Sequence, residues 1–437
     1  MTDTIYALAT APGRAALAVM RLSGPDCRRV LAEMTGRSLP PARRMTLRDL
    51  RDPAGRLLDK ALVVWFAGPA SFTGEDVVEL HLHGGPAVVV AAAAALAESG
   101  CRSAAPGEFT RRAFANGRLS LAEAEGVADL IDAETAQQSA QALQQLGGAL
   151  DQRFAGWRDA LIGALALLEA AIDFPDEDLP EDLAAGAASA LTALDRDLEA
   201  ALGEARGESV REGFRIALVG PPNAGKSSLF NMLTGRDAAI VTPIAGTTRE
   251  VIEADLNLNG YVVRIADTAG LRDTDDVVEA EGVRRARAWA KGAAVRLWLT
   301  DETFHVEQPR ELGPADWWVR TKADQVGPGP GGPAGPYIYR LDTGNPDEVG
   351  ALAADLGRHV SACLSGGDFP AITRARHREI LTEARNCLSR AIAGFGQAPE
   401  LVAEDVRLAA RALERLSGRI DSEAVLDRVF GSFCIGK

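Results

Sequence analysis

The feature that most constrains the fold of this chain is a phosphate-binding loop, GPPNAGKS, at residues 220–227. It matches G-x-x-x-x-G-K-[ST], follows the apolar run 215–219 and precedes a helical pattern at 228–233, so a strand, a loop and a helix are predicted in that order. Glycines let backbone N–H groups approach phosphate oxygens, and the helix N-terminus adds positive potential. Lys226 is expected to reach the β- and γ-phosphate oxygens and Ser227 to ligate Mg²⁺, which indicates a nucleoside-triphosphate site in an α/β domain.

Two further segments complete the predicted phosphate and metal site. DTAG at 267–270 ends the next apolar run, where Asp267 is expected to hold the water shell of the metal and the N–H of Gly270 to sense the γ-phosphate. GTTR at 246–249 contains Thr248, which can complete the magnesium site only while the γ-phosphate is present, and this predicts a switch. The other residues expected to contact the nucleotide are Asn223, Ala224, Gly225, Ser228, Thr242, Thr247, Thr268 and Ala269.

The base-reading segment is predicted at residues 321–324, TKAD, which is similar to the N-K-x-D motif of GTPases. The two oxygens of Asp324 can accept from N1–H and the exocyclic amine of guanine, whereas adenine would present an acceptor to a buried carboxylate. Guanine is therefore expected over adenine, with Thr321 in place of the usual Asn and Lys322 as a further contact. A solvated acid that starts a helix is the alternative role of Asp324.

The sequence lacks the residue that usually orients the attacking water in Ras-like GTPases, so another group must support hydrolysis. Leu271 follows DTAG, where Ras-like proteins have the glutamine that orients the attacking water. Asn223, inside the phosphate-binding loop, could instead hold a potassium ion that neutralises charge in the transition state, as an arginine finger does. Capping of the loop by Asn223 is the alternative. The other candidate potassium ligands are carbonyl oxygens of Thr242, Ile244 and Thr247.

Periodicity divides the chain into four parts. Residues 1–118 mix β-type runs with an alanine-rich helical run, which predicts an α+β domain. Residues 119–210 and 366–437 have helical spacing, and 211–365 alternate strands with helices or loops. The α/β part is therefore predicted to be inserted into one discontinuous all-α domain. The predicted strands include 61–66, 77–83, 215–219, 261–266 and 295–299, and the helical stripes are Leu161, Leu165, Leu168 and Ile172, and Ile380, Ala384, Leu388 and Ile392.

Composition narrows the class of protein. The 437 residues include 47 basic and 61 acidic ones, a net charge of −14, so a nucleic acid would have to bind locally. Five cysteines without C-x-x-C spacing favour a reducing cytoplasm. Because no apolar run reaches the length of a membrane span and no basic leader precedes an apolar core, a soluble, unexported protein is expected. The acidic stretch 173–180 is expected to be a loop, with a metal-binding cluster as the alternative.

Further short motifs lie outside the nucleotide site. They are DTI at 3–5, GR at 13–14, RLSG at 21–24, SFTGED at 71–76, HLHGG at 81–85, PGEFT at 106–110, RAF at 112–114, AIDFPD at 171–176 and FCIGK at 433–437. Together with the nucleotide motifs, they resemble the tRNA modification GTPases of the MnmE family, also called TrmE, along nearly the whole chain. The resemblance implies a folate-binding, dimerising α+β domain, a discontinuous helical domain and an inserted Ras-like P-loop domain.

The resemblance also implies a function. Members of this family hydrolyse GTP as homodimers whose G domains pair in a potassium-dependent way, and they act with MnmG, a flavoprotein that carries FAD, in a heterotetramer or larger complex. They add aminomethyl or carboxymethylaminomethyl groups to carbon 5 of the tRNA wobble uridine, with methylenetetrahydrofolate as the one-carbon source. A regulatory switch, for example in ribosome assembly, and a folate-dependent transferase with a regulatory G domain stay open as alternatives. The positions that match the family's folate contacts are Arg21, Glu79, Arg118 and Lys437.

Three features depart from the family pattern, and one of them is a short separation between DTAG and TKAD with a Gly- and Pro-rich loop after TKAD. Arg284 occupies the place of a glutamate proposed to act on the attacking water. Because an arginine cannot be a general base, Glu279 or Glu281 is expected to orient that water, unless the cation and the backbone suffice. Residues 340–344, RLDTG, replace a Ser-Ala pair before Thr-Gly, which suggests weaker contacts with the base.

Three residue types near these motifs have less specific roles. His81 and His83 alternate on one strand face, and without a third ligand they are expected to pack or hydrogen-bond rather than bind a metal. Apart from the resemblance, Glu79 would be an exposed strand residue. Cys434 lies in the FCIGK motif, where functional and spectator roles are both open.

Overall fold

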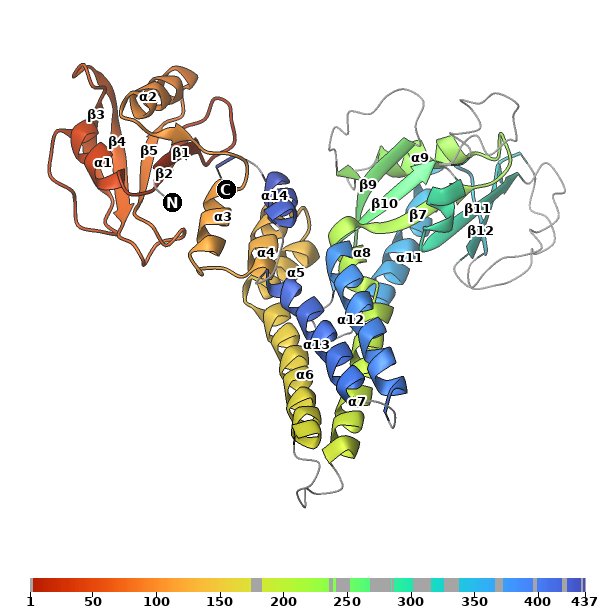
Figure 1. The fold of residues 1–437 in the computed structure, drawn as a ribbon. Helices are drawn as coiled ribbons and strands as arrows, with labels where there is room; N and C mark the ends of the chain where they lie inside the picture. Colours follow the sequence, from red (N-terminus) through yellow and green to blue (C-terminus); the bar gives the residue numbers. More distant parts are fainter. Residues whose placement is uncertain are drawn as a thin grey trace. The chain divides into compact units, whose positions relative to one another are not determined.

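The computed structural model folds into two compact units, each built from stretches far apart in the sequence (Figure 1). The first unit contains Met1–Ala128, Gln145–Leu194 and Glu383–Lys437, and the second contains Asp129–Gln144 and Asp195–Thr382. Within the described ranges, no helix combines the length and apolar character needed to span a membrane. The structure describes residues 3–173, 183–235, 239–240, 252–267, 284, 287–301, 316–325, 338–365, 372–395, 399–418, 423–433 and 435–436.

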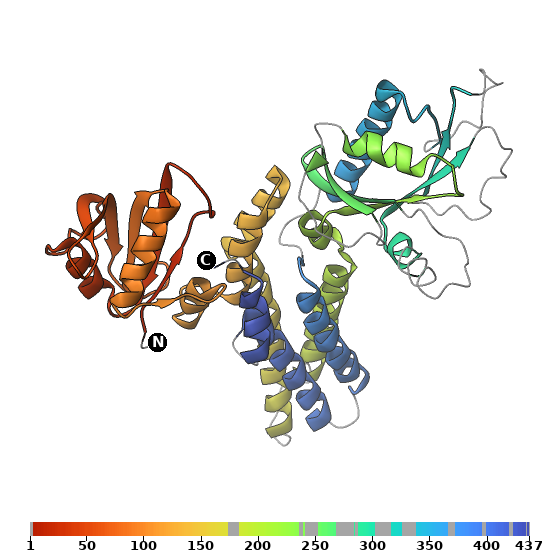
Figure 2. The ribbon, with the colours of Figure 1, turned by 90° about the horizontal axis from the view of Figure 1, so that it is seen from above.

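The first unit begins with a six-stranded sheet of order β3-β4-β5-β2-β1-β6, antiparallel except for the pair β1–β6. Helices α1 and α2 pack on one face, where Leu31 and Leu96 join the core (Figure 2). Because side chains alternate along a strand, Arg21 and Glu79 lie on the other face, as neighbours across β2 and β5. The elements are β1 (Ile5–Leu8), β2 (Leu17–Ser23), α1 (Cys27–Thr35), β3 (Thr46–Arg51), β4 (Leu57–Phe66), β5 (Val77–His83), α2 (Pro86–Glu98), β6 (Arg102–Ser103) and α3 (Glu108–Ala115).

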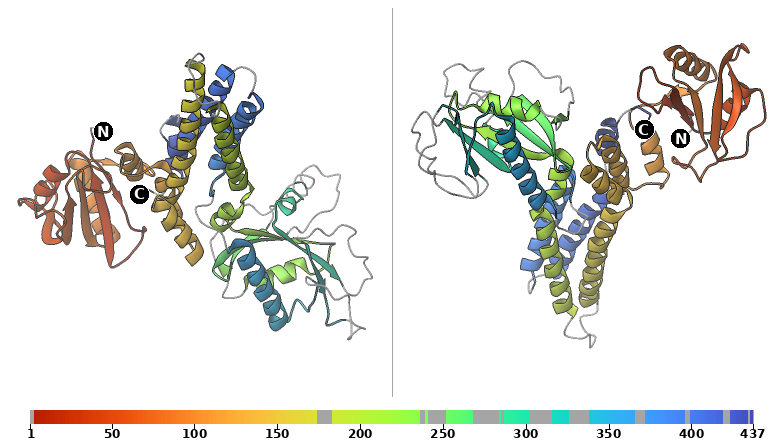
Figure 3. Two further views of the ribbon diagram at one scale, coloured as in Figure 1. Left: turned by 90° about the horizontal axis from the view of Figure 1, so that it is seen from below. Right: turned by 180° about the vertical axis from the view of Figure 1, so that it is seen from behind.

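Helices make up the rest of the first unit and lead into the second. In α6 the buried side chains recur every three or four residues from Leu150 to Leu168, and this stripe explains why α6 packs along α13, as Figure 3 shows from two sides. Helix α8 leads directly into the first strand of the second unit. The helices are α4 (Leu121–Asp132), α5 (Ala136–Leu146), α6 (Ala149–Asp173), α7 (Leu183–Gly203), α8 (Arg206–Glu212), α12 (Ala375–Ala393), α13 (Pro399–Glu414) and α14 (Glu423–Gly431), with a 3₁₀ turn at Arg415–Ser417.

The second unit is built around a seven-stranded sheet of order β13-β12-β11-β7-β10-β9-β8. The strands from β13 to β10 in that order run parallel, and β9 and β8 continue the sheet with antiparallel pairings. Helices α9 and α11 share one core with the sheet, through residues such as Leu229 and Leu352. The elements are β7 (Phe214–Val219), α9 (Lys226–Thr234), β8 (Ala239–Ile240), β9 (Ile252–Leu258), β10 (Tyr261–Asp267), β11 (Val295–Asp301), β12 (Asp316–Thr321), β13 (Ile338–Arg340) and α11 (Pro346–Leu364).

These elements confirm the predicted fold class: an α+β N-terminal part, helices on both sides in the sequence, and a P-loop α/β part inserted between them. All five predicted strands and both predicted helical stripes lie in elements of the expected type. The compact units divide the helical segments at other points than residues 118, 210 and 365, so the four domain boundaries stay a prediction. Most of the acidic stretch 173–180 lies outside the described residues.

Candidate functional site

The phosphate-binding loop joins β7 to α9 through two glycines with positive φ. Gly220 has φ +148°, and a Cβ there would lie 2.2 Å from the carbonyl oxygen of Leu299 on the neighbouring strand β11. Gly225 has φ +82° and is the N-cap residue of α9. Only glycine tolerates both the positive φ and the close approach of the Leu299 carbonyl oxygen at position 220. The glycine that the sequence pattern requires is therefore also the residue that the turn geometry requires.

Lys226 and Ser227 lie at the start of α9, and Ser227 contacts Asp267, with which it was predicted to share the metal site. The Lys226 ammonium donates to the carbonyl oxygens of Gly220 and Pro221, at 2.9 and 2.8 Å. Burial lowers the pKa of Lys226, while the nearby carboxylate of Asp267 acts in the opposite direction. The hydroxyl of Ser227 donates to Oδ2 of Asp267 at 2.6 Å, so the two groups expected around Mg²⁺ adjoin each other although forty residues separate them.

The base-reading segment follows β12 and contacts the phosphate-binding loop. Thr321 is fully buried, and its hydroxyl lies 2.8 Å from the carbonyl oxygen of Ala224 and 3.1 Å from that of Thr300. Lys322 forms an ion pair with Asp301. Asp324 is exposed, which differs from the buried carboxylate expected from the sequence; its oxygens would become desolvated only when a base covers them.

One cavity of about 1390 Å³ runs between these segments. This is ample for a nucleotide, since small-molecule sites are typically about 300–1,000 Å³. The loop 342–344, which the sequence singled out only as a departure from the family pattern, also lines it. There Asp342 accepts from the N–H of Gly344 at 2.7 Å and donates its own N–H to Glu348 at 2.7 Å, so this wall is preformed. Predicted residues that line the cavity are Asn223, Gly225, Lys226, Ser227, Ser228, Lys322 and Asp324; lining residues not predicted include Asn231, Gln325, Asp342, Thr343 and Gly344.

Several predicted site residues lie outside the described part of the chain. Arg284, which occupies the place of the family's glutamate, is by contrast among the described residues, and it is exposed. Asn223 has φ +61°, a left-handed conformation that asparagine tolerates better than most residues. The residues outside the description are Thr242, Ile244, Thr247, Thr248, Thr268, Ala269, Gly270, Glu279, Glu281, Cys434 and Lys437.

A second candidate site lies on the open face of the N-terminal sheet. Nε and Nη2 of Arg21 donate to Oε1 of Glu79 at 3.0 and 2.8 Å. The side chain of Glu79 is 17% exposed, so the alternative of a freely exposed strand residue is wrong. The Arg21 guanidinium also lies 5.9 Å from the centre of the Phe72 ring. Phe72 lines a cavity of about 390 Å³ together with Arg118, which brings three of the predicted features into one region.

This region suits a planar anion with a polar edge. The residues that line the cavity include two arginines, Arg43 and Arg118, and two phenylalanines, Phe66 and Phe72. Guanidinium groups pair with carboxylates, and phenyl rings pack against flat apolar bodies. A reduced folate has a polar pterin, an aromatic middle and a carboxylate tail, so these residues fit it. Residues 435–436, next to Lys437, lie against the end of β1, where a Cβ on Gly436 would be 2.3 Å from the oxygen of Leu8.

The two histidines contact different carboxylates. Nδ1 of His83 lies 2.7 Å from Asp59, and Nε2 of His81 lies 3.4 Å from Glu79. No cluster of three or more metal-binding side chains occurs among the described residues. His83 therefore hydrogen-bonds, as expected, whereas Nε2 of His81 is buried near the Glu79 carboxylate without a hydrogen bond.

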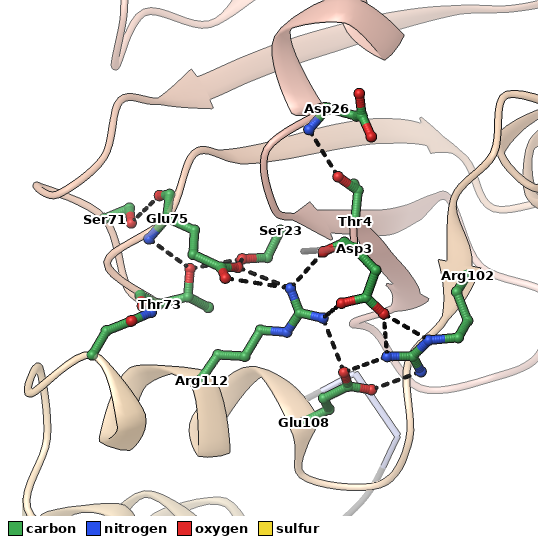
Figure 4. A network of polar contacts seen from close by, with 11 residues as sticks. Asp3, Thr4, Ser23, Asp26, Ser71, Thr73, Glu75, Arg102, Glu108 and Arg112 are labelled. Atoms are coloured by element: carbon green, nitrogen blue, oxygen red, sulfur yellow. Dashed lines mark hydrogen bonds and ion pairs between the residues drawn. The ribbon is translucent and has the colours of Figure 1, made fainter. Parts of the chain in front are cut away.

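A buried ionic network supports the loop that carries Phe72 (Figure 4). The fully buried Arg112 donates to the carbonyl oxygen and the carboxylate of Asp3, at 2.9 and 2.8 Å, and to Glu75 and Glu108 at 3.1 Å each. Desolvation disfavours the charged guanidinium, but these carboxylates outweigh it, and the pKa of Arg112 lies above its ordinary value. The network thus fixes α3 to the loop at 71–76.

Comparison with known proteins places the chain in a family. A family model described as "GTP-binding protein TrmE N-terminus" matches residues 4–118, and one described as "MnmE helical domain" matches residues 121–434. The tRNA modification GTPases MnmE of Caulobacter vibrioides and Phenylobacterium zucineum are 57% and 56% identical to it over 449 and 447 residues, covering 100% of each chain. That of Paramagnetospirillum magneticum is 49% identical over 443 residues, again with 100% of both chains covered. The chain therefore belongs to the tRNA modification GTPase MnmE family.

Proposed function

We propose that the chain hydrolyses GTP in the cavity between the phosphate-binding loop and the TKAD segment. The observation that carries the proposal is that this one cavity is lined by Lys226 and Ser227 at one place and by Asp324 at another, which are the groups needed for a triphosphate and for guanine. Membership of a family named for its GTPase activity supports it.

Each of these residues has a defined task in the proposal. The Lys226 ammonium contacts two neutral carbonyl oxygens. With a nucleotide bound, it would instead pair with negatively charged phosphate oxygens. Ser227 and Asp267 would hold Mg²⁺ and its water shell, and the metal would supply charge neutralisation at the phosphates. Asp324 would accept the two donors of the guanine edge. Glu279 or Glu281, or a potassium ion at Asn223, would support the attacking water.

Calorimetry on the full chain with Mg²⁺ tests the nucleotide assignment. We expect heat of binding with GTP and at least about tenfold weaker binding with ATP, because adenine would leave the Asp324 carboxylate without donors. Lys226→Met should abolish GTP turnover. Asp324→Asn should reduce the preference for guanine. Equal binding of the two nucleotides would refute the assignment.

We further propose that GTP hydrolysis serves modification of carbon 5 of the tRNA wobble uridine, together with the flavoprotein MnmG and a methylenetetrahydrofolate carbon. The family membership and the fit of the N-terminal cavity to a folate support this. A homodimer in the cytoplasm, with potassium-dependent pairing of G domains, belongs to the same proposal. Reconstitution with MnmG, undermodified tRNA and a reduced folate, followed by nucleoside analysis, is the test. GTP turnover without any modified uridine would favour a regulatory switch instead.

A further inference from the structure

The nucleotide cavity contains a second carboxylate beside that of Asp324. Asp342 lines the same cavity, although it lies outside the TKAD segment. The parallel pairing of β12 with β13 continues into the two segments, because the N–H of Ala323 donates to the carbonyl oxygen of Leu341 at 3.4 Å. Asp324 and Asp342 are the next residues along each segment. The fold therefore brings both carboxylates to the same end of the sheet, where α/β proteins bind their ligands.

Asp324 is presented by a closed turn and has both oxygens available. The N–H of Gln325 donates to the carbonyl oxygen of Lys322 at 3.1 Å, and Lys322 has φ +58°, in the left-handed region. The ammonium of Lys322 pairs with Asp301 and not with Asp324. Among the residues that the structure describes, no group bonds to the exposed Asp324 carboxylate. Its two oxygens can therefore accept two donors of a ligand.

Asp342 is held in place by three hydrogen bonds and has one oxygen available. Its Oδ1 accepts from the N–H of Gly344 at 2.7 Å, its N–H donates to Glu348 at 2.7 Å, and its carbonyl oxygen accepts from the N–H of Asn345 at 3.0 Å. The side chain of Asn345 donates to the same Glu348 at 3.0 Å. Within the described ranges, nothing bonds to Oδ2 of Asp342. The loop thus holds one charged acceptor in a fixed place.

A guanine base has one donor more than a single carboxylate can accept. Its N1–H and one hydrogen of its exocyclic amine match the two oxygens of Asp324, and the second amine hydrogen is left over. A donor that is buried without an acceptor costs binding free energy. Oδ2 of Asp342 is an unused acceptor on the wall of the same cavity. The segment 340–344, where the sequence suggested weaker contacts with the base, therefore offers a contact of another kind.

We propose that Asp342 is a specificity-determining residue of the GTP site, and that its Oδ2 accepts the second hydrogen of the guanine exocyclic amine. The inference rests on the proposed binding of GTP in this cavity. Asp324 accepts N1–H and the first amine hydrogen, so the two carboxylates divide the guanine edge between them. Because Asp342 contacts only the amine, it distinguishes guanine from hypoxanthine, which has N1–H but no exocyclic amine. Asp342 binds the base and takes no part in hydrolysis.

Calorimetry with GTP and inosine triphosphate (ITP), which carries hypoxanthine, tests this assignment on the full chain with Mg²⁺. In the unsubstituted protein we expect ITP to bind at least about tenfold more weakly, because it lacks two charge-assisted hydrogen bonds. Asp342→Asn keeps the acceptor for Gly344 but puts an amide donor in place of Oδ2. It should weaken GTP by about five- to tenfold and leave ITP unchanged. Asp324→Asn should weaken both nucleotides, because both have N1–H.

The control is Asp347→Asn, which changes an exposed carboxylate of the same segment that does not line the cavity and should leave both dissociation constants unchanged. Thermal unfolding of each variant shows whether it is folded. Equal weakening of GTP and ITP by Asp342→Asn, or of neither, overturns the assignment of Asp342. An equal loss of GTP affinity in Asp347→Asn also overturns it, since the effect would then not depend on contact with the base. If the unsubstituted protein binds neither nucleotide, the proposed GTP site itself is refuted.

Discussion

At the scale of single residues, Thr321 shows how this chain accommodates a threonine in place of the usual Asn. Its buried hydroxyl connects the end of β12 to the phosphate-binding loop through Ala224. Thr321→Val keeps the shape but removes the hydroxyl that bonds this carbonyl oxygen, so we expect GTP affinity to fall by roughly five- to tenfold. Calorimetry measures this, with Thr321→Ser as the control that keeps the hydroxyl. Equal affinities of the two variants would contradict the role.

Glu108 gives a prediction about pH. Desolvation opposes its ionisation, but hydrogen bonds from Arg102, the N–H of Ala105 and Arg112 outweigh it, so its pKa lies below the ordinary 4.5. A pKa that is lower in the folded state stabilises the fold above the unfolded pKa and loses this contribution as pH falls through the folded value. Glu108→Gln should therefore reduce the free energy of unfolding by about 1–3 kcal/mol at pH 7, and less below about pH 4. Urea unfolding at several pH values measures it.

The matched control is Glu33→Gln, which removes an exposed carboxylate that pairs with Arg29 one turn earlier in α1. Such exposed pairs contribute about 0.3–0.5 kcal/mol. A loss of stability at Glu108 that is equally small, or that does not shrink in acid, would show that the buried network does not act through the charge of this residue.

The sequence indicates the roles of some of the site residues but not of others. Lys226, Ser227 and Asp267 could be assigned because the phosphate-binding pattern fixes backbone geometry and spacing. Arg43 could not, since its position depends on a left-handed backbone and on Trp65, more than twenty residues away. The pairing of Arg21 with Glu79 is likewise set by the register of β2 against β5, which no local pattern reveals.

At the scale of elements, the apolar stripe of α6 and the apolar runs of β7, β10 and β11 could be predicted because period and burial coincide there. The short edge strands β8 and β13 have two and three residues, too few for any period, and pairing alone defines them. The cavity wall at 342–344 depends on the N-cap of α11, where Asn345 accepts from the N–H of Asp347 at 3.0 Å.

Helix α8 gives the element-scale prediction, because it leads into β7 and the phosphate-binding loop. Asp129 of α4 pairs through Oδ1 with Arg211 of α8 at 2.9 Å and with Arg374 at 2.7 Å. Its side chain is 14% exposed, so Asp129→Asn removes the charge that both guanidinium groups contact, although Arg211 keeps its pair with Glu212, and it should lower the free energy of unfolding by about 1–3 kcal/mol. Denaturant unfolding measures this. The control is Asp132→Asn on the same helix, at an exposed position; equal stability of the two variants would rule out this attachment of α8.

At the scale of the whole molecule, the proposed potassium-dependent pairing of two chains makes GTP turnover depend on both cation and protein concentration. We expect K⁺ to raise turnover per chain at least about tenfold over Na⁺, since a bound cation neutralises charge in the transition state as an arginine finger does. Turnover per chain should also rise with protein concentration until the chains are paired.

The variant that tests the cation is Asn223→Gly, because glycine keeps φ +61° without strain while it removes the side-chain oxygen. We expect it to lose the stimulation by K⁺ but to keep Mg²⁺-dependent GTP binding, which depends on Lys226 and Ser227 instead. Asn223→Asp keeps an oxygen and should keep part of the stimulation. If Asn223→Gly keeps the full stimulation by K⁺, the stimulating cation does not bind through the side chain of residue 223. Turnover that stays independent of protein concentration even at dilutions where the homodimer dissociates would remove pairing from the mechanism, and the two parts of the proposal can thus fail separately.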